Sequence, residues 1–143
     1  MTLQKREFYE GAALHQLFAR DEDVSAKYTP PFFVLNRRLF VYFKYCTKSR
    51  SPWGFTFNSD EHRAFNERDQ GKPLIIALIC GSDGIVALNF LGYKELVDCE
   101  SLPAHFSCYR NHGQHYEING PKGRLEGKIA PSAWKNLLSY EVL

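Results

Sequence analysis

The chain has 143 residues, of which 44% are hydrophobic, 15% aromatic and 24% charged, and its formal net charge is +2. This length is that of one ordinary domain, and this hydrophobic content excludes a chain that is disordered throughout. The near-neutral charge excludes a uniformly basic protein. The longest apolar run, Leu74–Cys80, is too short for a membrane-spanning helix, which needs about 20 residues, so no membrane partner is expected.

Charge is distributed unevenly along the chain. From Val24 to Ser59, a stretch of 36 residues contains no Asp or Glu, yet it holds ten aromatic residues. Its basic residues are Lys27, Arg37, Arg38, Lys44, Lys48 and Arg50. A basic, aromatic-rich segment with strand-like patterning is typical of a surface that binds a polyanion.

The first half of the chain predicts a helix followed by a hairpin. Apolar residues at helical spacing indicate a helix over residues 6–20. After a polar loop that ends at Pro30-Pro31, two β-prone runs predict a hairpin. These runs are Phe32–Leu35 and Leu39–Cys46, joined by Asn36-Arg37-Arg38. Both faces of the second run are largely apolar, so it should be a central strand covered on both sides.

Lys44 is unusual because it lies in the middle of this strand. A lysine that is buried on a two-sided strand needs a carboxylate, a ligand or a route for its ammonium to reach water. A structural lysine that reaches the edge of the sheet is the alternative to a functional one.

The remaining elements alternate between strands and short helices. Asn58 or Ser59 should cap a helix that runs to about Gln70, with Gly71 as its C′ residue. The other predictions are strands at Trp53–Phe57 and Leu74–Cys80, a tight turn at Ser82-Asp83-Gly84 into a strand at Ile85–Phe90, a helix at Tyr93–Cys99, a β-meander over Phe106–Arg110, His115–Ile118 and Arg124–Ile129, and a final helical turn at Trp134–Leu138. The chain is therefore expected to form a single α+β domain over residues 1–143. Its mixed β-sheet, to which the acid-free segment should supply three strands, should have flanking helices and be followed by a C-terminal β-meander.

The cysteines favour a reducing compartment. None of the four forms a C-x-x-C pair, and the N-terminal residues lack the apolar region of a signal peptide. A cytoplasmic protein with free thiols is expected. Cys108, His112 and His115 have spacing that suits zinc, but they supply only three ligands across a predicted turn, so a structural role is favoured and no metal site is expected.

The order helix, strand, strand, strand, helix, strand resembles the core of the PD-(D/E)XK, or restriction-endonuclease-like, fold. The resemblance implies a nuclease site in which acids hold Mg²⁺ and a lysine activates water. Lys44 lies where the lysine of that family would be, and Glu10 lies where some members carry a helix acid. The residue two before Lys44 is Tyr42 rather than an acid, and Phe32–Leu35 has no Asp. An active site would therefore have to be rearranged.

A second resemblance involves residue identity as well as spacing. The segments YFKYCTK at 42–48, SPWGFTF at 51–57 and ALICGSDGIVAL at 77–88 are similar to a group of small uncharacterised bacterial proteins. Their pattern combines Y-I-K-Y-S, S-P-W-x-F-T-F and C-G-x-D-G-I. This resemblance implies no activity, but it implies a shared framework that includes Lys44, Lys48, Pro52, Trp53 and Asp83.

The preferred hypothesis is non-catalytic binding of a phosphate-rich partner, either nucleic acid or nucleotide. Arg and Lys neutralise phosphates, and aromatic rings stack on bases. The expected binding residues are Arg37, Arg38, Lys48, Arg50 and Trp53 on turns and links, with Tyr42 and Lys44 deeper. The alternative interpretation is that the aromatic residues of 53–57 are core and the basic residues are solvated loop charges.

Two other function classes remain open. One is a metal-dependent nuclease that uses Glu10 and Lys44, and only this hypothesis calls for a cofactor, Mg²⁺. The other is a protein-interaction module, such as an inhibitor acting in bacterial or phage defence. The sequence also leaves open a homodimer.

Overall fold

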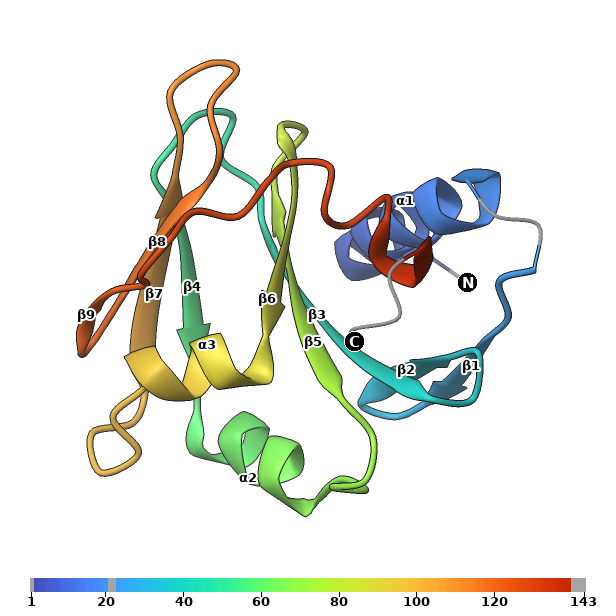
Figure 1. Cartoon of the computed structure of the whole chain (residues 1–143), viewed down its shortest axis with the longest axis horizontal. Helices are drawn as coiled ribbons and strands as arrows, with labels where there is room; N and C mark the ends of the chain where they lie inside the picture. Colours follow the sequence, from blue (N-terminus) through green and yellow to red (C-terminus); the bar gives the residue numbers. More distant parts are fainter. Residues whose placement is uncertain (1, 21–22, 140–143) are drawn as a thin grey trace.

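The computed structural model describes residues 2–20 and 23–139. These residues form an α+β single domain (Figure 1). Its helices are α1 (Lys5–Arg20), α2 (Ser59–Glu67) and α3 (Phe90–Leu96), with a 3₁₀ turn at Leu137–Ser139. Its strands are β1 (Ala26–Thr29), β2 (Phe32–Leu35), β3 (Leu39–Cys46), β4 (Trp53–Phe57), β5 (Leu74–Cys80), β6 (Gly84–Asn89), β7 (Ala104–Tyr109), β8 (Glu117–Gly120) and β9 (Gly123–Arg124). No helix within these two ranges is long and apolar enough to cross a membrane.

The strands form two sheets that face each other. The five-stranded sheet has the order β1-β2-β3-β5-β6, and the four-stranded sheet has the order β4-β7-β8-β9. The first sheet is mixed, because β3 and β5 are parallel while its other neighbours are antiparallel. The meander β7-β8-β9 confirms the expected C-terminal architecture.

The placement of β4 corrects one expectation, that the acid-free segment supplies three strands of one sheet. Strand β4 leaves the first sheet and pairs with β7, with Trp53 opposite Cys108. Its burial alternates, because Trp53, Phe55 and Phe57 are buried while Gly54 and Thr56 are exposed. This one-sided pattern suits a sheet with one face in the core, whereas all seven residues of β5 are buried.

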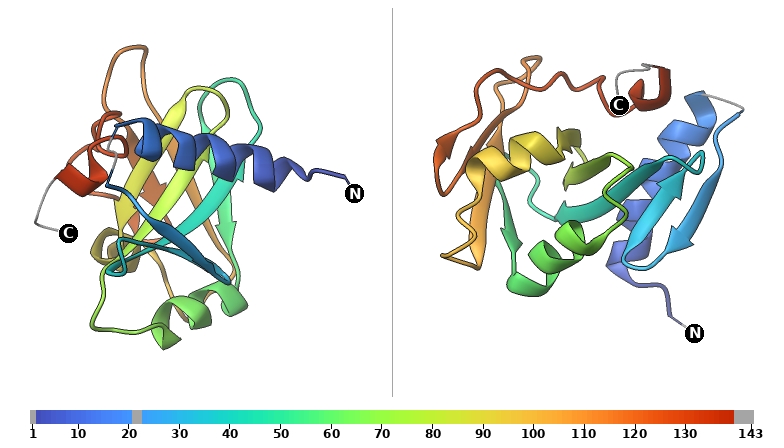
Figure 2. Two further views of the ribbon diagram at one scale, coloured as in Figure 1. Left: turned by 90° about the vertical axis from the view of Figure 1, so that its right-hand side faces the viewer. Right: turned by 60° about the horizontal axis from the view of Figure 1, so that its bottom comes forward.

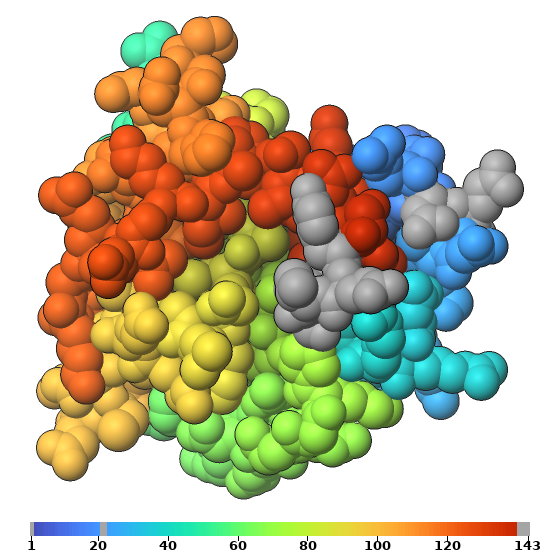
Figure 3. Space-filling model, viewed as in Figure 1, coloured from blue at the N-terminus to red at the C-terminus, as the bar shows by residue number. Residues whose placement is uncertain are grey.

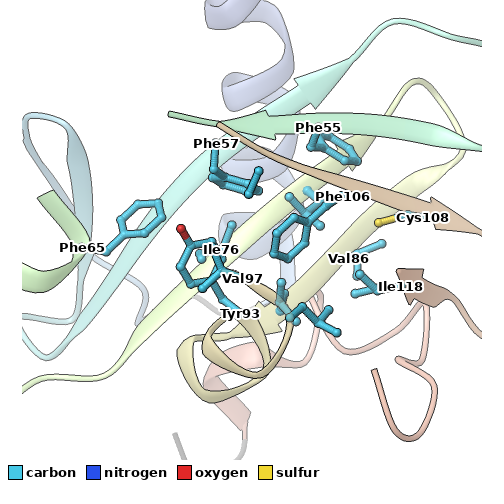
Figure 4. Close-up of a cluster of buried hydrophobic side chains, with 14 of the residues drawn as sticks. Phe55, Phe57, Phe65, Ile76, Val86, Tyr93, Val97, Phe106, Cys108 and Ile118 are labelled. Atoms are coloured by element: carbon cyan, nitrogen blue, oxygen red, sulfur yellow. The ribbon is translucent and has the colours of Figure 1, made fainter. Parts of the chain in front are cut away.

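The larger hydrophobic core fills the space between the two sheets. Figure 4 shows aromatic side chains of the four-stranded sheet and of the helices meeting Ile76 and Val86 of the five-stranded sheet there. Phe57 of β4 makes edge contacts with Phe65 of α2, Tyr93 of α3 and Phe106 of β7, at centroid distances of 6.0, 5.2 and 5.1 Å. Helices α2 and α3 therefore close one end of the space between the sheets (Figure 2, right).

A second core lies on the other face of the five-stranded sheet. Helix α1 crosses that face (Figure 2, left), and its buried residues Ala13 and Leu17 pack there with Trp134 and Leu137. The Trp134 indole donates a hydrogen bond to the Ala13 carbonyl at 3.0 Å. Figure 3 shows the segment after β9 running across the viewed face of the molecule from the four-stranded sheet to α1.

Local capping fixes two of the helix starts. Asn58 and Glu61 form a complete capping box at the start of α2, which satisfies backbone donors that the first helical turn leaves free. The helix ends at Glu67, so Gly71 is not its C′ residue. Helix α3 begins at Phe90 rather than at the expected Tyr93, because the Asn89 side chain accepts a hydrogen bond from Gly92 N–H at 2.8 Å.

Strand β1 was not expected from the sequence. Its four residues are all exposed, so the strand shows no alternation of buried and exposed side chains. The strand forms by pairing with β2, where Lys27 lies opposite Val34. It extends the sheet beyond the part that the second sheet covers (Figure 1).

Candidate anion-binding site

The predicted binding residues do not form one continuous face. Arg37 and Arg38 precede β3, whereas Lys48 and Arg50 follow it. The eight residues of β3 span roughly 26 Å at about 3.3 Å per residue. The two exposed basic pairs therefore lie at opposite ends of the strand and cannot hold the same small ligand.

Lys44 lies between these ends and is held by protein groups. Its ammonium donates to a Glu61 carboxylate oxygen at 2.8 Å and to the Thr56 carbonyl at 2.7 Å. It also lies 5.2 Å from the centroid of the Phe57 ring. The Lys44 and Glu61 side chains are 22% and 13% exposed. The carboxylate that the sequence called for is thus Glu61 at the start of α2.

Tyr42 belongs to the same network. Its hydroxyl donates a hydrogen bond to the Glu61 oxygen that Lys44 contacts. Burial, and then the hydrogen bond to Glu61, raises the pKa of Tyr42 well above its usual range. Lys44, Thr56 and Glu61 come from β3, β4 and α2, so this network ties the two sheets to a helix.

Glu10 is not the partner of Lys44. It is half-buried on α1, and Arg6 lies 3.9 Å from it. Burial is the main cause that raises the pKa of the Glu10 carboxyl above its usual range. Residues 2–20 and 23–139 contain no group of three or more His, Cys, Asp or Glu side chains that could hold a metal ion. The nuclease hypothesis stays a prediction, with no assembled site to support it.

Trp53 is not a surface residue, contrary to expectation. It is 2% exposed, its ring packs against Tyr116, and its indole donates to the Lys48 carbonyl at 3.0 Å. Trp53, Phe55 and Phe57 all belong to the core between the sheets. Their rings therefore offer no face on which a base could stack.

A second ionic network lies near Arg50. Arg110 contacts the Asp83 carboxylate at 2.9 Å, and the Tyr116 hydroxyl donates to the same oxygen. Burial alone would raise the pKa of Asp83, but these hydrogen bonds outweigh it and hold the pKa below the ordinary value. A hollow of about 400 Å³ at this end is lined by Arg50, Asp83, Arg110 and His112 among others. The carboxylate in its wall makes it a poor site for an anion.

Of the remaining predicted residues, Arg38 and Lys48 are exposed, and Arg37 lines a different hollow. This space of about 490 Å³, here called the basic hollow, is lined by Ser25, Ala26, Lys27, Thr29, Val34, Arg37, Phe40 and Lys72. Three of these residues are cationic and none is acidic. Val34 and Phe40 give it an apolar wall.

The fold explains why these side chains meet. Lys27 lies opposite Val34, and Val34 lies opposite Phe40, so all three project from the same face of the sheet. Arg37 comes from the tight turn between β2 and β3, where Asn36 and Arg37 have positive φ values of 50° and 60°. The turn is closed because Arg38 N–H donates to the Leu35 carbonyl at 3.0 Å.

Lys72 reaches the basic hollow from the loop between α2 and β5. Phe40 N–H donates to the Pro73 carbonyl at 2.9 Å, which fixes this loop beside the start of β3. Parallel pairing places the start of β5 next to the start of β3, with Leu74 opposite Phe40. Lys72 and Arg37 therefore approach the same space from opposite sides of β3.

The three cations of the basic hollow are unpaired within the described chain. The salt bridges among residues 2–20 and 23–139 involve other cations, so no carboxylate of these residues lies within 4.0 Å of the charged groups of Lys27, Arg37 and Lys72. Three positive charges gathered without compensation attract an anion. The sequence singled out Arg37 but not Lys27 or Lys72 as binding residues. Lys72 stands just before the apolar run Leu74–Cys80, which pairs in parallel with β3. This position is the sequence feature that could have identified Lys72 as a binding residue.

Comparison of the chain with protein-family models, with curated proteins and with solved structures found no match. The function of the chain must therefore be inferred from the chemistry of its site.

Proposed function

We propose that the protein binds a phosphate-bearing partner, a nucleotide or a nucleic acid, in the basic hollow, without catalysis. The observation that carries this proposal is the convergence of Lys27, Arg37 and Lys72 on a space with no acidic lining residue. Cationic side chains neutralise phosphate oxygens, and Arg can bind two of them at once.

The shape and lining of the hollow support a nucleotide over a simple inorganic anion. Its volume of about 490 Å³ is within the range of ligand pockets, roughly 300–1,000 Å³. Val34 and Phe40 offer apolar contact for a base or a sugar, and Ser25 and Thr29 offer hydroxyl groups. Phosphate would lie against the cations and the base against the apolar wall.

The test is a titration of a 5′-phosphorylated dinucleotide at low salt, followed by NMR or fluorescence. A triple variant Lys27→Ala/Arg37→Ala/Lys72→Ala should bind at least about tenfold more weakly, since each hydrogen bond to a charged group contributes about 1.5 kcal/mol or more. The variant Lys27→Ala/Arg37→Ala/Lys72→Arg keeps one positive charge at the site, so it should bind more tightly than the triple alanine variant.

A matched control removes the same charge elsewhere. Lys48, Arg50 and Lys135 are all exposed and lie outside the basic hollow, so the triple variant Lys48→Ala/Arg50→Ala/Lys135→Ala has the same net charge. It should bind as the unmodified protein does. Equal weakening in both triple variants, or no binding by the unmodified protein at low salt, would contradict the proposal.

A further inference from the structure

We propose that the partner is a single strand of nucleic acid, which runs from the basic hollow across the α2–β5 loop into a second hollow beside Phe90. This inference rests on the proposed function and narrows its ligand to one class. The second hollow, here called the Phe90 hollow, has a volume of about 340 Å³.

The Phe90 hollow repeats the chemistry of the basic hollow. Its lining includes Arg68, Lys94 and Phe90, together with Gln70 and Leu91, and none of its lining residues is acidic. Arg68 and Lys94 lie over the Phe90 ring at 4.6 and 5.2 Å from its centroid. The Phe90 ring also stacks on Tyr93, so the hollow offers the positive charge of these cations to phosphate and the exposed Leu91 side chain to a base.

One loop joins the two hollows. Residues 68–73 connect α2 to β5, and Lys72 lines the basic hollow while Arg68 and Pro73 line the Phe90 hollow. The Arg68 guanidinium fixes the loop by donating to the Phe65 carbonyl at 2.7 Å and to the Lys72 carbonyl at 3.3 Å. Figure 1 shows this loop passing below the β1–β2 hairpin before it enters β5.

The separation of the hollows suits a short length of one strand. Phe40 of the basic hollow lies on β3 and Asn89 of the Phe90 hollow lies at the end of β6, on either side of β5. Neighbouring strands lie about 4.8 Å apart, so two steps make roughly 10 Å. In an extended single strand consecutive phosphates lie roughly twice as far apart as the 3.4 Å axial repeat of a duplex strand, so three phosphates cover this distance and the two of a dinucleotide do not.

An unpaired strand fits better than a duplex. A base can enter the hollow against Val34 and Phe40 only if it is not stacked inside a double helix. Bases of a single strand are free to turn toward apolar walls while the backbone follows the cations. Two separate hollows with apolar walls therefore indicate unpaired nucleotides.

One acidic side chain lies along this track. Asp69 is exposed in the loop, and its carboxylate accepts a hydrogen bond from Gly71 N–H at 3.0 Å. Its charge should repel the strand. Asp69→Asn is therefore expected to tighten binding of a strand that crosses the loop.

The experiment compares two single-stranded probes, a 5′-phosphorylated dinucleotide and an oligonucleotide of about 8 nucleotides, and a duplex of the longer sequence. The longer single strand should bind more tightly than the dinucleotide and the duplex. Lys94→Ala should weaken only the longer strand, by several-fold, and should reduce the slope of log affinity against log salt by about 0.7. Asp69→Asn should strengthen binding of the longer strand. Lys94→Arg, which keeps the positive charge, should bind the longer strand as the unmodified protein does.

The control and the contrary outcomes separate this inference from the proposed function. Lys135→Ala, an exposed lysine away from both hollows, should leave both probes unaffected. If the longer strand binds no more tightly than the dinucleotide, or if Lys94→Ala and Lys135→Ala have equal effects, the two-hollow track is wrong while binding in the basic hollow stands. Equal affinity for the duplex would overturn the choice of a single strand. Absence of binding to every probe would overturn both proposals.

Discussion

Lys44 and Asp83 each bring a charge into the space where the two sheets meet. Lys44 on β3 contacts Thr56 on β4 and Glu61 on α2. Asp83 lies in the turn between β5 and β6. It accepts hydrogen bonds from Arg110, which follows β7, and from Tyr116, which precedes β8. Both networks are partly buried, so losing one partner leaves the other poorly solvated. Their effect should therefore appear in stability rather than in ligand binding.

A double-mutant cycle on Lys44 and Glu61 tests this assignment. Lys44→Met and Glu61→Gln should each lower the free energy of unfolding by about 2 kcal/mol, and the cycle should give a coupling of about 1–3 kcal/mol. Glutamine at position 61 can still complete the capping box, so loss of the cap is minimised. Urea unfolding measures the energies.

The same variants separate structure from binding. Lys44→Met should leave dinucleotide affinity unchanged under conditions where the variant is folded, since Lys44 does not line the basic hollow. A large loss of affinity in the folded variant, or a coupling near zero, would show that the ion pair has been misassigned.

Asp83 should make stability depend on pH. Its folded-state pKa lies below the ordinary value of 3.8, so its stabilisation is fully present above that value and is lost as pH falls through the folded-state pKa. Asp83→Asn should lower the free energy of unfolding by about 2 kcal/mol at neutral pH. The difference between the two proteins should shrink as pH falls below 3.8, which urea unfolding at several pH values would measure. A difference that is constant with pH would contradict the assignment.

At the scale of elements, the link after β3 and the turn between β5 and β6 bring their backbone atoms close together. The end of β3 and the end of β5 are joined by a hydrogen bond from Gly81 N–H to the Cys46 carbonyl at 2.8 Å. Gly81 has a φ of +56°, and a Cβ there would lie 2.2 Å from the Lys48 carbonyl oxygen. The link after β3 can therefore pack on the β5–β6 turn only if residue 81 has no side chain.

Substitution of this glycine should be costly, while a matched glycine should tolerate change. Gly81→Ala is expected to lower the free energy of unfolding by at least about 2 kcal/mol, because it combines backbone strain with a steric clash. Gly54→Ala on the exposed side of β4 meets no atom within 4 Å and should be neutral or slightly stabilising. Thermal unfolding compares them, and equal melting temperatures for the two variants would refute the packing argument.

At the scale of the whole molecule, strong local patterns made several elements predictable. The apolar run Leu74–Cys80 and the hairpin from Phe32 to Cys46 follow from hydrophobic pattern alone, and both were predicted with the observed bounds. Capping by Asn58 followed from side-chain chemistry. Strand β1 could not be predicted, because its exposed residues acquire strand structure only from β2.

The site was harder to predict than the fold, because it depends on tertiary pairing. Lys72 lies 35 residues after Arg37 in the sequence, and the parallel pairing of β3 with β5 brings Lys72 to Arg37. Lys48 and Arg50 belong to the same acid-free segment as Arg37, yet a whole strand separates them from it. Proximity in sequence was therefore a poor guide to which charges act together.

The pairing of β4 also has a consequence for the time course of folding. Trp53, Phe55 and Phe57 are made early, but their strand pairs with β7, at Cys108, Phe106 and Ala104. A ribosome would synthesise about 50 further residues, in several seconds at roughly 5–20 residues per second, before this partner exists. During that interval the three large aromatic side chains lack the strand β7, beside which they are buried in the folded protein. A nascent chain that stalls before residue 104 should therefore be a target for chaperones or aggregation, whereas one that has passed β7 should not.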